Sequence, residues 1–60
     1  MSAVYNPEAD TMAQIEKLEQ EARELRKRIQ AATQEPYRQA LSGELAELQS
    51  NIARLQARLP

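Results

Sequence analysis

The stretch ATQEPYRQ, residues 32–39, lies near the middle of a 60-residue chain. It separates two segments that are rich in helix-forming residues. Because proline is poorly tolerated inside a helix, Pro36 leaves two alternatives: one long kinked rod, or a chain that folds back on itself. The apolar residues on either side decide between them.

Both flanking segments carry apolar residues at alternating spacings of three and four, the heptad pattern of a helix that packs against another helix. In the first segment these residues are Ile15, Leu18, Ala22, Leu25, Ile29 and Ala32. In the second segment they are Leu41, Leu45, Leu48, Ile52, Leu55 and Leu59. We call these twelve residues the seam.

The two halves of the seam are out of phase. Continuing the first register would place seam positions at Pro36 and Gly43, whereas the second register is displaced by two residues. A two-residue slip rotates the apolar stripe by about 200°, so a straight rod would carry two stripes facing nearly opposite ways. Pro36 also biases Glu35 toward an extended backbone and suits the first turn of a new helix, with Thr33 or Glu35 near its cap.

A hairpin instead brings the two halves of the seam together. Each layer joins two residues whose numbers add up to 70, for example Leu25 with Leu45 and Leu18 with Ile52. We therefore expect an all-α fold, an antiparallel two-helix coiled-coil hairpin that associates into a helical bundle. The expected bounds within this single domain, residues 1–60, are an N-terminal arm at 1–6, a helix at 7–32, a turn at 33–35 and a helix at 36–59.

Three local features have alternatives. Asn6 is the expected N-cap of the first helix because Pro7 follows it, and Asp10 is a competing cap. Gly43 costs about 1 kcal/mol relative to Ala inside a helix; we expect it to lie within a continuous second helix, facing away from the first, and the alternative is a helix that begins at Ser42. Tyr5, on the arm, either packs on the first helix or reaches a partner.

The composition excludes several kinds of site. The chain has no Cys and no His, so it has no disulfide and no thiolate metal site, and it lacks the commonest metal ligand and the most usual general base. No phosphate-binding loop or nucleophile motif is present, and a two-helix hairpin offers no enclosed pocket for a small molecule. We therefore expect no catalysis, no cofactor, no metal and no small-molecule substrate.

The charge and hydropathy pattern narrows the class of partner. Eight basic and nine acidic residues give a formal net charge of −1, whereas a dedicated nucleic-acid binder shows a basic excess. The uncharged stretches are too short to span a membrane, and the N-terminus lacks the features of a signal peptide. We expect a protein partner, no membrane, and a location in the cytoplasm or inside a virion or assembly.

The second helix carries an uncharged stripe beside the seam. Its members recur at the same spacings of four and three, and they are Ser42, Ala46, Gln49, Ala53, Gln56 and Pro60. Depletion of charge marks the core of an interface, so the stripe, together with Tyr37 beside the turn, is our candidate interface; ordinary helix surface is the alternative. The first helix carries a corresponding charged stripe, Met12, Glu16, Glu19, Arg23, Arg26 and Gln30.

A dense run of charges precedes the turn. Glu19 with Arg23 and Glu24 with Arg28 have the spacing of favourable ion pairs along a helix, as expected for a solvated face. The alternative is a basic contact patch at the closed end of the hairpin, which we call the basic cluster: Arg23, Arg26, Lys27, Arg28 and Arg38.

We expect a non-enzymatic protein–protein interaction module, that is a small adaptor, inhibitor or assembly factor, acting as a homodimeric four-helix bundle or in a larger complex. Ten large aliphatic seam residues cannot be fully covered by two helices, and small domains without disulfides or metals usually need association. The alternatives are a structural component of a virion or secretion machine, and a nucleic-acid-associated regulator that uses the basic cluster.

Overall fold

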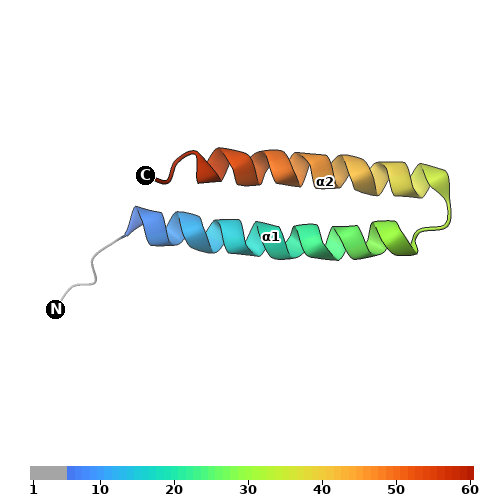
Figure 1. Cartoon of the computed structure of the whole chain (residues 1–60), viewed down its shortest axis with the longest axis horizontal. Helices are drawn as coiled ribbons and strands as arrows, with labels where there is room; N and C mark the ends of the chain where they lie inside the picture. Colours follow the sequence, from blue (N-terminus) through green and yellow to red (C-terminus); the bar gives the residue numbers. More distant parts are fainter. Residues whose placement is uncertain (1–5) are drawn as a thin grey trace.

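The computed structural model describes residues 6–60, and these form two helices that pack against each other. Helix α1 spans Pro7–Ala31 and helix α2 spans Glu35–Gln56. Figure 1 shows α2 running back alongside α1 after a short turn. The predicted all-α helical hairpin is therefore confirmed. Residues 1–5, with the predicted positions of the arm and of Tyr5, lie outside the described residues.

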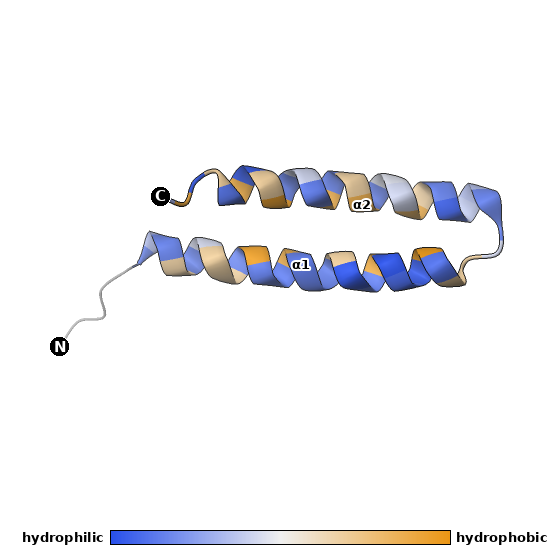
Figure 2. Cartoon of the chain, in the orientation of Figure 1, coloured by the Kyte–Doolittle hydropathy of each residue, from blue (hydrophilic) through white to orange (hydrophobic). Residues whose placement is uncertain are grey.

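The predicted seam supplies almost all of the described residues that are not exposed. Figure 2 shows the hydrophobic segments of each helix turned toward the other helix. All twelve seam residues are buried or half-buried, and in residues 6–60 only Thr11 and Glu19 join them. The free energy gained by removing these apolar side chains from water holds the two helices together.

Helix α1 begins at the cap that the sequence favours. The Asn6 backbone is extended, and its side-chain Oδ1 accepts hydrogen bonds from the backbone N–H of Glu8 at 3.0 Å and of Ala9 at 3.3 Å. Pro7 occupies the first helical position, where a missing N–H removes no helical hydrogen bond. Asp10 lies inside the first turn and accepts a hydrogen bond from Gln14 at 3.3 Å, so it does not cap the helix.

The chain reverses in residues 32–34 without glycine. Ala32 and Gln34 have extended backbones, and no residue between 6 and 60 has a positive φ. The Ala32 N–H still donates to the Arg28 carbonyl at 2.9 Å and to the Ile29 carbonyl at 3.3 Å, which closes the last turn of α1. The predicted helix 7–32 is thus one residue too long, because Ala32 leaves the helical conformation.

The start of α2 differs from the prediction. The cap is Gln34, not Thr33 or Glu35, and its side chain makes no capping hydrogen bond. The helix begins at Glu35, one residue earlier than predicted, so the expected effect of Pro36 on Glu35 is wrong. Pro36 stands in the first turn, where backbone N–H groups have no partner within the helix and its missing donor costs nothing.

The far end of α2 also differs, since the helix stops at Gln56 rather than at residue 59. Beyond it the chain makes tighter bonds, from the Arg58 N–H to the Leu55 carbonyl and from the Leu59 N–H to the Gln56 carbonyl, both 3.1 Å. Such contacts to the third preceding residue commonly finish a helix. Pro60 adds to this effect because it disfavours a helical Leu59.

Helix α2 runs continuously through Gly43, so the alternative start at Ser42 is wrong. A Cβ atom added at Gly43 would meet nothing within 4 Å.

We therefore predict that Gly43→Ala raises the free energy of unfolding by about 1 kcal/mol and the melting temperature by about 4–8 °C, as measured by circular dichroism. Ala40→Gly, at another exposed position of α2, is the matched control and should lower stability by a similar amount; a lower melting temperature for Gly43→Ala would contradict the prediction.

The Asn6 cap supports a second prediction. Asn6→Ala should lower the free energy of unfolding by about 1 kcal/mol, because two N–H groups lose their acceptor. Amide hydrogen exchange at Glu8 and Ala9 should accelerate. Asp10→Ala is the comparison, and a larger loss of stability in that variant than in Asn6→Ala would show that Asp10 is the working cap.

Candidate functional site

The seam is only partly covered by the hairpin itself. Four of its twelve residues are buried, namely Ile15, Ala22, Ala32 and Leu41, and the other eight are half-buried. The described chain is one layer of two helices, and no further described element covers the two flanks of the contact between them. Apolar surface thus remains open to water along both flanks of the hairpin.

One flank, which we call the stripe face, contains the uncharged stripe of α2 and the charged stripe of α1. A hollow there is lined by side chains of both stripes and of the seam: Met12, Ile15, Glu16, Glu19, Gln56 and Leu59. Helical spacing of seven residues places Arg23 and Arg26 on the same face as Glu16 and Glu19. All seven residues of the candidate interface are exposed, namely Ser42, Ala46, Gln49, Ala53, Gln56, Pro60 and Tyr37. Tyr37 lies seven residues before Glu44 and therefore on the other flank of the hairpin, apart from the stripe.

Two residues of the charged stripe stand out by their exposure. Met12 is 53% exposed, which makes it one of two large apolar side chains that the described chain leaves in water; the other is Tyr37 at 54%. Glu19 is half-buried, and within residues 6–60 it is the single charged residue that is not exposed. The predicted ion pair between Glu19 and Arg23 is not formed in the hairpin.

The other flank, which we call the opposite face, is more highly charged. One hollow there is lined by Glu21, Glu24, Leu25, Arg28 and Glu44, and a second by Gln14, Leu18, Asn51, Arg54, Leu55 and Arg58. Helical spacing places nine charged side chains on this face, against five on the stripe face, where Glu35 lies seven residues before Ser42. The nine are Asp10, Lys17, Glu21, Glu24, Arg28, Glu44, Glu47, Arg54 and Arg58. The stripe face is therefore the flank with less charge to remove from water.

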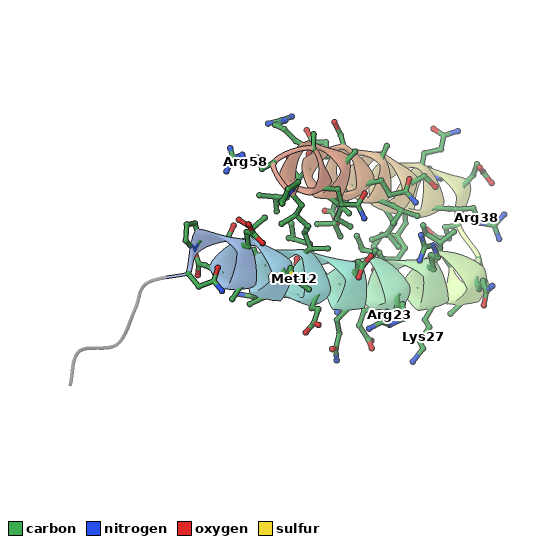
Figure 3. The ribbon with its side chains drawn as sticks, turned by 60° about the vertical axis from the view of Figure 1, so that its left-hand side comes forward. Met12, Arg23, Lys27, Arg38 and Arg58 are labelled. Atoms are coloured by element: carbon green, nitrogen blue, oxygen red, sulfur yellow. The ribbon has the colours of Figure 1, made fainter. Side chains whose placement is uncertain are left out.

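The members of the basic cluster are all exposed, but they point in different directions. Arg23 and Lys27 project from the side of α1 that faces away from α2, whereas Arg38 lies on α2 beside the turn (Figure 3). Arg28 shares its hollow with three carboxylates. Lys27 approaches Glu24 at 3.8 Å, in place of the predicted pair between Glu24 and Arg28. Nearby carboxylates thus offset the positive charge around Arg28 and Lys27.

Arg38 has a structural contact that the sequence did not reveal. Its guanidinium Nη2 donates a hydrogen bond to the Ala32 carbonyl at 3.1 Å, in a part-buried position. Its backbone N–H donates to the Gln34 carbonyl at 3.0 Å. Arg38 therefore ties the first turn of α2 to the end of α1.

Neither described helix has an apolar stretch long enough to cross a membrane. Within residues 6–60, no three or more Asp and Glu side chains gather closely enough to hold a metal ion.

The contact of Arg38 gives a third prediction. Arg38→Ala should lower the free energy of unfolding by about 1 kcal/mol, because the Ala32 carbonyl loses its donor. Gln39→Ala, at the next exposed position, should change it by no more than about 0.5 kcal/mol. Chemical denaturation of both variants measures the difference, and equal stabilities would show that the hydrogen bond has no role in holding the turn.

The chain was compared with known proteins in three ways. No protein-family model, no curated protein and no solved structure matches it.

Proposed function

We propose that this chain is a non-enzymatic protein–protein interaction module, a small adaptor, inhibitor or assembly factor that packs another helical surface against its stripe face. In this proposal the two helices form an antiparallel coiled coil, and association completes a helical bundle. The observation that carries the proposal is the half-covered seam, in which eight apolar residues remain partly in water.

The single layer of two helices leaves apolar seam residues partly exposed, and a second layer would bury them further. Burial of apolar surface contributes about 25 cal/mol per Å², and helices gain most of their stability from packing of an apolar face. A second layer of helices would cover the open edge of the seam and add this contribution. Domains are usually built from at least two packed layers for the same reason.

The stripe face is the better of the two flanks for such a layer. Between residues 42 and 56, the α2 residues that lie on this face are all Ser, Ala or Gln. Small side chains allow helices to approach closely, and removal of charges from water is costly unless they are paired. The opposite face would require the desolvation of about twice as many charged groups.

The other functions considered have weaker support. A structural role in a larger assembly would use the same half-covered seam, and a chain that is monomeric and marginally stable when purified would favour that role. A nucleic-acid-associated role would use the basic cluster, where carboxylates surround Arg28 and Arg38 is engaged at the turn. Nucleic-acid binding that weakens steeply with salt would favour it.

The fourth prediction tests the stripe face. Ala46→Glu with Ala53→Glu should abolish association, because the carboxylates would be buried without partners. Ala40→Glu with Ser50→Glu adds the same charge to α2 outside the stripe face and is the matched control. The readouts are the mass of the purified protein in solution and the set of proteins that the tagged chain captures from its native cell. If the Ala46 and Ala53 variant leaves both unchanged, the proposal fails.

A further inference from the structure

The charges along the charged stripe of α1 are complementary to those of a second copy that runs in the opposite direction. Going from Glu16 to Arg26, two carboxylates are followed by two guanidinium groups at spacings of three, four and three residues. When a second α1 runs in the opposite direction over the first, Glu16 falls opposite Arg26 and Glu19 falls opposite Arg23. Every facing pair then has opposite charges, and each pair occurs twice.

A two-fold axis requires this kind of self-complementarity, because residue i then contacts residue j and j contacts i. The centre of the charged stripe is the level of Glu21, midway between Glu19 and Arg23. Met12 and Gln56 line one hollow, and Gln14 and Arg58 line another, so the two residues of each pair lie at about the same level. Because α2 runs back along α1, moving from these residues of α1 up to Glu21 means moving down α2 by the same number of residues. Glu21 is therefore level with residues 47–51 of α2. The middle of the uncharged stripe, Gln49, lies within this range.

We propose that the partner on the stripe face is a second copy of this chain, related by a two-fold axis at the level of Glu21 and Gln49. This inference rests on the proposed function and names its partner. The two copies of α1 lie antiparallel across the axis, as do the two copies of α2, and the turns are at opposite ends of the four-helix bundle. The Glu–Arg contacts between the copies of α1 set the register.

The half-burial of Glu19 supports this arrangement. It is a carboxylate beside the apolar hollow of the stripe face, and in the hairpin it has no ion pair. Covering that face would remove it further from water, which is costly for an unpaired charge. A second copy supplies Arg23 at the position facing Glu19, so the charge is paired as it is covered.

The α2 side of the interface is compatible with the same register without specifying it. The uncharged stripe from Ser42 to Gln56 extends equally to both sides of Gln49. Its small side chains accept close approach of a second α2, and Gln side chains can donate and accept hydrogen bonds in either direction. Orientation is therefore determined by the charges of α1, since like charges that face each other disfavour the other registers.

Two variants with the same net charge and the same number of substitutions test the register. Glu16→Arg with Arg26→Glu exchanges the charges of one facing pair, so all facing pairs remain opposite and the dimer should persist. Glu16→Arg with Arg23→Glu places two cations opposite each other and two carboxylates opposite each other. The dissociation constant of this variant's dimer should rise roughly tenfold or more, because each altered contact occurs twice.

The measurement is sedimentation equilibrium of the full-length chain over a range of concentrations, with circular dichroism to check that both variants are helical. The wild-type chain should be a dimer, and its dissociation constant should rise as salt is added, because salt screens the facing charges. A monomeric wild-type chain would overturn the inference, and so would equal dimerisation of the two variants. In either case the proposed function survives if Ala46→Glu with Ala53→Glu still removes proteins captured by the tagged chain.

Discussion

The packing of the two helices depends on the reversal of the chain in residues 32–34. Each helix has an apolar stripe that it cannot cover by itself, and the other helix is the surface that the described chain provides. Because the two stripes differ in phase by two residues, a continuous rod would have turned them away from each other. The extended backbones of Ala32 and Gln34 turn α2 back, and this brings both stripes into one seam.

The turn that makes this reversal is held by backbone and side-chain hydrogen bonds and not by a special residue. The Ala32 N–H stays bonded to the end of α1 while its carbonyl accepts from Arg38 on α2. Ala32 itself is buried at the closed end of the seam, 9% exposed. The same residue thus ends α1, covers the seam and provides the acceptor that ties the helices together.

A single layer of two helices has two edges, and this geometry leads directly to the proposed function. Eight seam residues are only half-buried in this layer, and its two flanks differ in chemistry. The opposite face carries mixed charges along both helices, whereas the stripe face carries its charge on α1 and, on α2, at Glu35 beside the turn. A partner that covers the stripe face therefore meets the uncharged stretch of α2 from Ser42 to Gln56 and a helix whose charges are ordered from acidic to basic. A reversed copy of the same chain fits that order.

The sequence by itself determined the seam, the hairpin, the Asn6 cap and the two stripes, because heptad spacing and capping are local patterns that survive in the folded chain. It did not determine the cap of α2 at Gln34 or the end of α2 at Gln56, since these depend on which backbone groups find partners at a terminus. Only the tertiary structure decided that Arg38 bonds across the turn, that Arg28 lies among carboxylates, and that Glu19 is half-buried. Each of these features depends on how closely the two helices lie, and the periodicity within one helix does not give that distance.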